Sequence, residues 1–280
     1  MTDAELLADF ELHMMTLKRS PQTILNRLEC VRRLAATLPV GLLEASPKDL
    51  QRWQESIADL SHNTMDIYSR HIVAFYAWAV VYGHLAAAPT NLMVRVGRRK
   101  GIPHPIRASE LKLVLACSTG DLRLAYVLAA FAGLRCGEIC RLRGEDLQLD
   151  AAQPTALIRG KGGRERRVPL LPPVVEALSG SRARGPVLLG PTGRAWSPNL
   201  LSVTSHHFMR SIGVESTLHS LRHYFATEVV KMTRDLLLVR DLLGHASLQT
   251  TQVYLLSSID GAQEKLAGFS MGAAGLMSNN

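Results

Sequence analysis

Residues 217–245 read TLHSLRHYFATEVVKMTRDLLLVRDLLGH, and this stretch decides the fold class of the carboxy-terminal half of the chain. Thr217 is a typical helix N-cap residue, and the residues after it predict a helix through Lys231. A second helix is expected over residues 234–243. Gly244 is its predicted stop, because glycine readily adopts the left-handed conformation that closes many helices. The stretch therefore predicts two consecutive helices followed directly by a histidine.

Two polar side chains share one face of the first predicted helix. His219 and Arg222 are three positions apart, which places them on the same side. A lone histidine is more often a structural hydrogen bonder, but here the pair precedes His245, at the end of the next helix. An imidazole exchanges protons near neutral pH. A guanidinium stays charged and can hold two phosphate oxygens at once. The combination favours a site that acts on a phosphodiester.

A glycine-rich turn lies upstream, in RGKGGRERRVPL at residues 159–170. Residues 155–158 are β-prone and residues 165–170 form a returning strand, so the segment predicts a β-hairpin with Lys161 at its tip. The rest of this half is expected to be helical, with helices beginning near Ser109 and after Ser197-Pro198. The predicted fold class is therefore mainly α with a small antiparallel β-hairpin or sheet.

Arg135, in AGLRCGE at 132–138, and Tyr254, in QTTQVYL at 249–255, complete the polar set. Each is a weak signal alone, because most arginines are solvated and most tyrosines pack or hydrogen bond. A tyrosine that attacks a phosphodiester creates extra negative charge on the phosphate oxygens, which two preorganised guanidiniums would stabilise. The phenol has an ordinary pKa near 10 and needs a base to become a nucleophile.

This set resembles the catalytic residues of the tyrosine recombinase (phage integrase) family. In chain order its members are Arg135, Lys161, His219, Arg222, His245 and Tyr254. The resemblance is close over about residues 107–258 and implies a 3′-phosphotyrosyl intermediate on the tyrosine. It also implies that the lysine protonates the leaving 5′ oxygen, His219 takes the tyrosine proton and His245 donates to the phosphate. Glu138 would brace the arginine motif, whereas His223 would be structural.

Residues 3–94 predict four helices, starting near residue 3 and after Ser20-Pro21, Ser46-Pro47 and Ser61. The last one carries an aromatic stripe that reads as helical core. The segment resembles the helical core-binding (SAM-like) domain of Xer-like recombinases and integrases. We expect a core-type DNA-binding domain over 1–95, a basic linker over 96–106 and a catalytic domain over 107–280 with a tail at 258–280.

The formal net charge of +8 favours a polyanionic partner. Charge is concentrated in two segments, 95–107 and 159–167, each with five Lys or Arg residues. The predicted DNA contacts are Arg95, Arg98, Arg99, Lys100, Arg107, Arg159, Arg164 and Arg166. The resemblance implies double-stranded DNA at specific core-type sites and a homotetramer on DNA, with a directionality factor as a candidate further partner.

No metal or cofactor is expected, because two arginines and a lysine supply the charge that a metal would otherwise bring. The four cysteines lack zinc spacing and read as small hydrophobes. No apolar run reaches the roughly 18 residues of a membrane span. The acidic start lacks a signal peptide's pattern, so a cytoplasmic protein is expected.

Several functions compete. The first is a phage or mobile-element integrase, and its alternative is a Xer-type resolvase of chromosome or plasmid dimers. Because the predicted helices begin near residue 3, we expect no separate arm-binding module, and this expectation fits a minimal integrase and a Xer-type resolvase alike. A catalytically silent DNA-binding regulator would not need the full polar set. A metal-dependent nuclease would need more carboxylates than Glu145, Asp146 and Asp150 supply. A type IB topoisomerase would not carry the Xer-like amino-terminal half.

Overall fold

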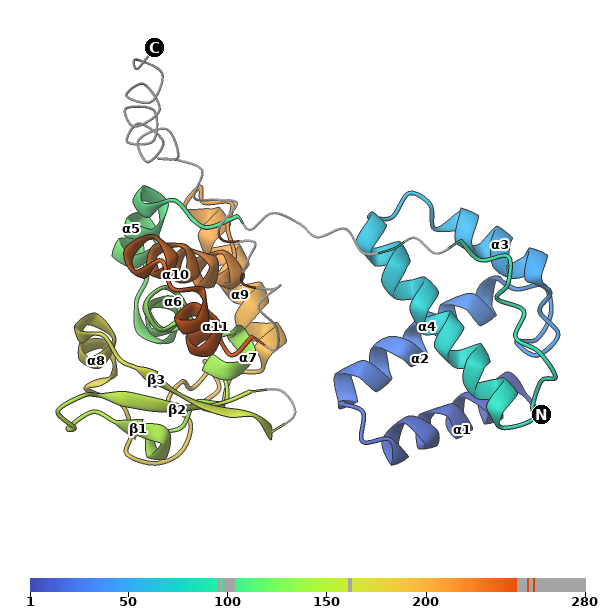
Figure 1. Ribbon diagram of the computed structural model, residues 1–280, viewed down its shortest axis with the longest axis horizontal. Helices are drawn as coiled ribbons and strands as arrows, with labels where there is room; N and C mark the ends of the chain where they lie inside the picture. Colours follow the sequence, from blue (N-terminus) through green and yellow to red (C-terminus); the bar gives the residue numbers. More distant parts are fainter. Residues whose placement is uncertain (95–96, 98–103, 161–162, 246–250, 252–253, 255–280) are drawn as a thin grey trace, which may run out of the picture. The chain divides into compact units, whose positions relative to one another are not determined.

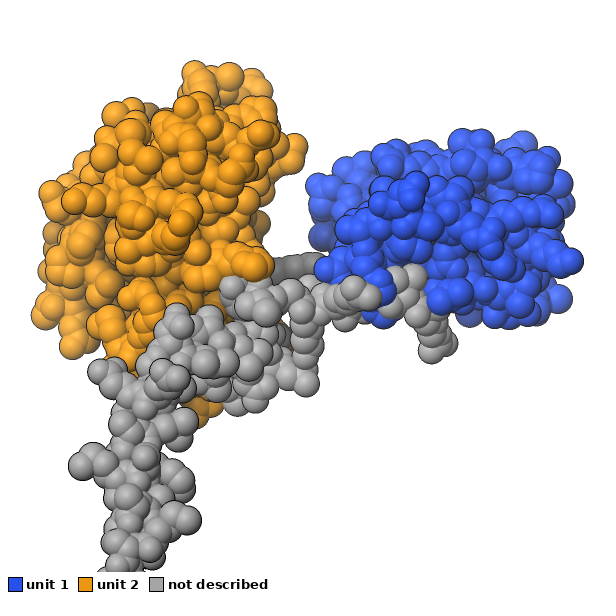
Figure 2. Space-filling view, turned by 90° about the horizontal axis from the view of Figure 1, so that it is seen from above, with its two compact units in different colours: residues 1–101 blue, residues 102–280 orange. Residues whose placement is uncertain are grey.

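The computed structural model describes residues 1–94, 97, 104–160, 163–245, 251 and 254 (Figure 1). The chain divides into two compact units, Met1–Gly101 and Ile102–Asn280 (Figure 2). The division falls inside the basic segment 96–106 that the sequence analysis assigned to a linker. Each unit is described by itself below.

The first unit consists of helices that begin where the sequence places N-cap residues. They are α1 (Asp3–Thr16), α2 (Pro21–Thr37), α3 (Pro47–Ser56) and α4 (His62–Val81). The side chains of Ser20, Ser46 and Ser61 each accept a hydrogen bond from a backbone N–H of the first turn. These caps satisfy backbone donors that a helix start otherwise leaves without a partner. The prediction of four helices, three of them capped by these serines, is confirmed.

The aromatic stripe of α4 forms the core of this unit, as predicted. Phe75 and Tyr76 are fully buried and Trp78 is nearly so, whereas Ile67 of the same helix is 43% exposed. Phe75 meets Phe10 of α1 edge-on, with ring centroids 5.3 Å apart. The buried hydroxyl of Tyr76 donates to the carbonyl of Leu42 at 2.8 Å, so its burial leaves no donor unsatisfied.

The second unit is built around α6, which is apolar on all sides from residue 125 to residue 132. Its described helices are α5 (Ala108–Cys117), α6 (Gly120–Ala132), α7 (Cys136–Ile139), α8 (Pro172–Leu178), α9 (Pro198–Ser211), α10 (Leu218–Thr233) and α11 (Leu236–Leu243). Helices α8 and α10 both pack against α6 (Figure 1). A helix that is hydrophobic all round needs such cover. The observed fold is mainly helical, as predicted.

A three-stranded antiparallel sheet flanks these helices, in the order β1 (Leu147–Gln148), β2 (Thr155–Arg159) and β3 (Glu165–Pro169) (Figure 1). The hairpin β2–β3 was predicted, and in its register Ile158 lies opposite Arg166. Arg166 and Val168 lie two apart, and both are shielded more than the residues beside them. Side chains two apart share a face of a strand, so Arg166 points inward.

One predicted helix boundary was wrong. The second helix of the opening stretch was expected to start at residue 234, but Arg234 has φ +57° and closes α10 as its left-handed cap. The side chain of Asp235 then accepts from the backbone N–H groups of Leu237 and Leu238, which makes it the N-cap of α11. The short capping carboxylate, rather than the hydrophobic run, sets the start.

Two left-handed glycines bring separate helix ends together. Gly133 (φ +65°) closes α6, and a Cβ there would lie 2.5 Å from the ring of Phe225. Gly244 (φ +61°) closes α11, and a Cβ there would lie 3.0 Å from Nη1 of Arg166. Both positions therefore need glycine for conformation and for space. Arg135 follows the first turn by two residues, and His245 follows the second directly.

Candidate functional site

A buried carboxylate lies at the centre of the site. Glu138 is 3% exposed and sits in the short helix α7. It accepts a hydrogen bond from the backbone N–H of Arg135 and another from that residue's Nη1, both at 2.9 Å. Its predicted bracing contact with Arg135 is thus present in the structure.

A second arginine, from β3, reaches the same carboxylate. Arg166 donates from Nη1 and Nη2 to the two oxygens of Glu138, at 2.9 and 2.8 Å. Its Nε donates to the carbonyl of Leu242 at 2.8 Å. The side chain is only 13% exposed. This two-point ion pair connects the β-hairpin with α7 and with the end of α11.

A third guanidinium, that of Arg222 on α10, is buried beneath the other two. It is 1% exposed, and its Nη1 lies 3.7 Å from Glu138. It donates to the carbonyl of Gly133 and, at 2.8 Å, to that of Leu243. A buried charge needs such partners, because desolvation alone would be very costly.

The end of α11 supplies carbonyl acceptors to all three arginines. Leu242 binds Arg166, Leu243 binds both Arg222 and Arg135, and Gly244 accepts from Arg135 at 3.3 Å. The last carbonyls of a helix have no partner within it and carry its partial negative charge. The helix end is therefore a natural acceptor for guanidiniums, and it fixes their positions without neutralising them.

The pKa values of Glu138 and Arg222 reflect the excess of positive charge at the site. Burial by itself would raise the pKa of Glu138, but hydrogen bonds from Arg166 and Arg135 and their positive charges lower it to about 2. Burial and then the positive charge of Arg135 lower the pKa of Arg222 to about 9, although Glu138 opposes this. One carboxylate faces three guanidiniums, so the site retains positive charge.

Tyr254 is buried next to these arginines and is 2% exposed. It belongs to a small apolar cluster with Phe225, Val239 and Leu243, among others. Burial raises the pKa of its phenol, while the charges of Arg222 and Arg135 act in the opposite direction. The hydroxyl oxygen lies 2.7 Å from Nδ1 of His223, at hydrogen-bonding distance.

The histidine that contacts the Tyr254 hydroxyl is not the one that the sequence predicted. His219, expected to take the tyrosine proton, stacks edge-on against His223 with ring centroids 4.3 Å apart. His245 lies parallel to the Tyr254 ring at 6.5 Å, and its Nδ1 is 3.0 Å from Oγ1 of Thr251. The histidine that contacts the Tyr254 hydroxyl is therefore His223, to which the sequence analysis gave a structural role.

All three histidines are held toward the neutral form. Burial, followed by nearby positive charges, lowers the pKa of both His223 and His245 to about 4. The pKa of His219 is lowered by desolvation and then by Arg222 and Arg135, although part of its ring is exposed to solvent. At neutral pH these rings are therefore uncharged, and each has a ring nitrogen that can accept a hydrogen bond.

A cavity of about 520 Å³ opens beside the arginines. It is lined by Arg135, Gly137, Glu138, Arg141, Gly160, Arg164, Glu165, Arg166, Gly244 and His245. Its walls come from α7, from the β2–β3 hairpin and from the residues after α11. Four arginines face it against two carboxylates, so the cavity suits an anion.

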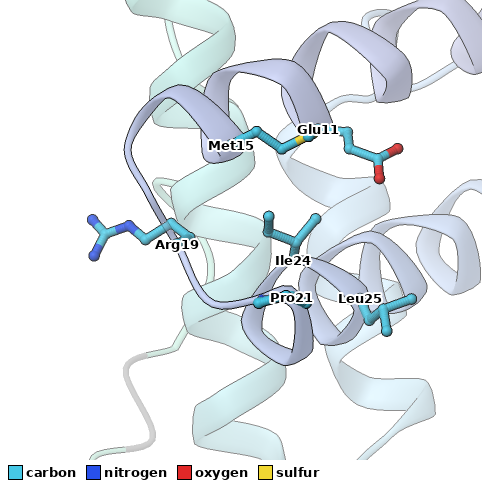
Figure 3. Close-up of a pocket in the computed structure, with 6 residues that line it drawn as sticks. All are labelled: Glu11, Met15, Arg19, Pro21, Ile24 and Leu25. Carbon is cyan, nitrogen blue, oxygen red and sulfur yellow. The ribbon is translucent and has the colours of Figure 1, made fainter. Parts of the chain in front are cut away.

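The first unit has a cavity of a different kind (Figure 3). It measures about 340 Å³, and Glu11, Met15, Arg19, Pro21, Ile24 and Leu25 line it between the end of α1 and the start of α2. Most of this lining is apolar, and it lacks a histidine, a tyrosine or a paired set of cations. We therefore place the candidate site at the arginine-lined cavity of the second unit, which is called the cavity of the second unit below.

Some predicted residues lie outside the described residues: Lys161, Arg95, Arg98, Arg99, Lys100 and the tail 258–280. Of the predicted DNA contacts that are described, Arg107 pairs with Glu110, and Arg159 pairs with Asp146 and Glu165. Arg166 is occupied by Glu138 and Leu242, so we reassign it from a DNA contact to a support of the arginine site. Arg164 remains exposed.

The chain was compared with known proteins. Residues 106–259 match the family described as the phage integrase family. A tyrosine recombinase XerC of Rhodospirillum centenum is 34% identical over 201 residues, 65% of this chain and 58% of the relative. XerC of Xanthomonas campestris pv. campestris is 32% identical over 194 residues, 65% and 60% of the two chains. The chain thus spans about three fifths of the length of these relatives.

Two solved structures share the architecture. A lambda integrase dimer bound to a COC′ core site matches with a TM-score of 0.75 at 18% identity, covering 91% of this chain and 95% of that chain. XerH recombinase bound to a palindromic difH substrate matches with a TM-score of 0.66 at 20% identity, covering 86% and 77%. These likenesses show the fold.

Among the described residues, no helix is long and apolar enough to cross a membrane.

Proposed function

Because this chain belongs to the phage integrase family, we propose that it is a site-specific DNA recombinase that cuts and rejoins DNA through a 3′-phosphotyrosyl intermediate on Tyr254. The observation that carries the proposal is the arginine site. Arg135 and Arg222, far apart in sequence, are fixed by one carboxylate and one helix end beside a buried tyrosine. A catalytically silent DNA-binding domain would not need a preorganised cationic site next to a tyrosine.

In the proposed reaction, the scissile phosphate enters the cavity and meets Arg135 and His245. The Tyr254 oxygen attacks phosphorus and its proton passes to a histidine, while Lys161 protonates the leaving 5′ oxygen. Reversal of the step rejoins the strand, because the phosphotyrosyl ester keeps the energy of the broken bond. The positions of Arg135 and Arg222 are fixed before substrate binds, so little reorganisation accompanies the growth of negative charge.

The hydrogen-bonded pair of Tyr254 and His223 suggests which histidine handles the proton. His223 is at hydrogen-bonding distance, and burial lowers its pKa to about 4, so the ring is uncharged at neutral pH and a ring nitrogen can accept a hydrogen bond from the phenol. We therefore propose His223 as a partner of the nucleophile, in the role that the sequence analysis gave to His219. His219 lies against His223, and after burial the charge of Arg222 is the next cause of its lowered pKa. Its position beside Arg222 suits a contact with phosphate.

For the biological role, we propose a phage or mobile-element integrase, as the sequence analysis favoured. The second candidate is Xer-type resolution of chromosome or plasmid dimers, and the XerC relatives support it. For both roles we propose double-stranded DNA as substrate and a tetramer on DNA, since exchange of two duplexes needs four cuts. A lambda integrase tetramer bound to a Holliday junction shares the fold, with a TM-score of 0.70.

The proposal is tested by covalent trapping. Selection from random duplexes first supplies a bound site, and nicked versions of that site are then incubated with protein in EDTA. Wild-type protein should become attached to a 3′ phosphate, and the Tyr254→Phe protein should bind the site but form no adduct. Tyr126→Phe, at a buried tyrosine of α6, is the matched control. Adducts that persist in Tyr254→Phe would contradict the assignment of the nucleophile.

A further inference from the structure

The cavity of the second unit holds more cations than a single phosphate requires. Arg135 and Arg166 both pair with Glu138, and the other carboxylate of the lining, Glu165, pairs with Arg159 at 3.2 Å. Two further arginines line the same cavity, Arg141 and Arg164. Among the described residues, neither side chain forms an ion pair or a hydrogen bond with another side chain. The proposed chemistry gives Arg141 no task.

Arg141 lines the cavity from the turn that follows α7. A Cβ at Gly137 would lie 3.4 and 3.6 Å from the two terminal nitrogens of Arg141. The exposed guanidinium thus lies beside the backbone of Gly137, which carries no side chain of its own. Gly137 itself lines the cavity between Arg135 and Arg141 in sequence. A ligand that reaches Arg135, the N-cap of α7, therefore meets a second, uncommitted guanidinium from the turn that follows this helix.

Arg164 enters from a different element. It lies just before β3, and its carbonyl accepts from the backbone N–H of Gly160 at 2.7 Å, which closes the described end of the hairpin. Its side chain is exposed and lines the same cavity. The two uncommitted guanidiniums therefore come from two separate segments, the turn after α7 and the β2–β3 hairpin.

We propose that Arg141, together with Arg164, binds the phosphate that neighbours the scissile phosphate on the cleaved DNA strand. Successive phosphates of one strand are separated by only about 3.4 Å along the duplex axis. A strand that delivers one phosphate to Arg135 must therefore bring its neighbours to the edge of the same cavity. Guanidinium is suited to this task, because its planar donors match two phosphate oxygens. The inference rests on the proposed function, whose substrate it specifies further.

The test combines single-residue changes with single-phosphate changes. Arg141→Gln and Arg164→Gln remove one charge each, and Arg184→Gln, at an exposed arginine outside the cavity lining, is the matched control. Binding of the selected duplex is measured from low to high salt. Each cavity variant should bind about tenfold more weakly, as expected for one lost charge-assisted hydrogen bond. The slope of log affinity against log salt should fall by about 0.9 per contact.

Neutral methylphosphonates, placed one at a time around the scissile position, then identify the phosphate. Replacing the neighbouring phosphate should weaken wild-type binding about tenfold and weaken Arg141→Gln binding far less, because the contact is already absent. If Arg141→Gln and wild type respond equally at every neighbouring position, the inference is wrong. It is also wrong if only the scissile position couples to Arg141.

The same samples separate this inference from the function on which it rests. Adduct formation by wild-type protein on the unmodified nicked duplex reports on the proposed recombinase chemistry alone. An adduct without coupling to a neighbouring phosphate refutes the inference and leaves the function intact. Coupling without any adduct leaves the phosphate contact supported and refutes the recombinase chemistry. Because Arg141 is exposed, its substitution should leave the thermal unfolding midpoint unchanged, which checks that the variant is folded.

Discussion

Replacing Glu138 with glutamine removes the one carboxylate that faces three guanidiniums, and we expect it to destabilise the second unit by about 3 kcal/mol at pH 7. The change preserves shape, so the loss is electrostatic. Two routes give this magnitude. The pKa falls from an ordinary 4.5 to about 2, and each unit is worth about 1.4 kcal/mol. Breaking a buried ion pair from one side typically costs about 3–5 kcal/mol.

The pH dependence distinguishes this electrostatic role from a packing role. The folded pKa is lower than the unfolded one, so the stabilisation is complete above pH 4.5 and is lost as pH falls through about 2. A protonated Glu138 resembles glutamine. The difference in unfolding free energy between wild type and Glu138→Gln should therefore shrink from about 3 kcal/mol at pH 7 to roughly half of that at pH 3.

Urea unfolding of both proteins at pH 7, 5, 4 and 3 measures this difference. Glu165→Gln is the matched control, since its carboxylate is half exposed and pairs with the exposed Arg159. An exposed pair contributes little, so this variant should stay within about 0.5 kcal/mol of wild type. A Glu138→Gln deficit that is the same at pH 3 and pH 7 would refute the electrostatic reasoning. So would a deficit no larger than that of Glu165→Gln.

Two further predictions concern the proton transfers. Lys161→Ala should slow cleavage of ordinary DNA by roughly a hundredfold, as expected of a lost general acid. A substrate with a bridging 5′-phosphorothiolate, whose sulfur leaves without a proton, should restore the rate of the variant. If the variant cleaves the sulfur substrate equally slowly, the lysine has another role. His223→Phe removes the ring 2.7 Å from the Tyr254 hydroxyl and should slow adduct formation by about the same factor. Adduct formation at the wild-type rate in His223→Phe would return the proton-accepting role to His219.

Much of the fold could be predicted because it depends on local signals. Three helix starts can be predicted from their N-cap serines, because the capping hydrogen bond needs no tertiary contact; these serines are Ser20, Ser46 and Ser61. The two helices of residues 217–245 and the β2–β3 hairpin follow from periodicity and glycine placement in the same way. The predicted helix start at residue 234 was wrong because Arg234 ends α10 and Asp235 begins α11. The left-handed φ of Arg234, which places the break between the two helices, is known only from the structure.

The site was harder to predict, because its contacts join segments that are distant in the sequence. His219 and His223 lie on one helix, and which of them faces Tyr254 depends on where residue 254 packs. Arg166 belongs to a basic run, and that pattern predicts a DNA contact. Strand alternation gives a different signal, because Arg166 is two residues before the apolar Val168 and the two share the inward face. A cation on that face needs a buried partner, which is Glu138.

The charge balance of the site explains why it is built from arginines that the protein does not fully neutralise. Three guanidiniums share one carboxylate, and their other partners are neutral carbonyls of α11 and of Gly133, which leaves a surplus of two positive charges. Burial first, and then the positive charge of Arg135, lower the pKa of Arg222 to about 9, so the neighbouring charge adds to the cost of keeping this guanidinium charged. A phosphodiester brings one negative charge, and the attack of a tyrosine oxygen adds a second. Under the proposed function, this surplus matches the charge of the transition state rather than that of the bound substrate, and interactions that strengthen only in the transition state are those that accelerate a reaction.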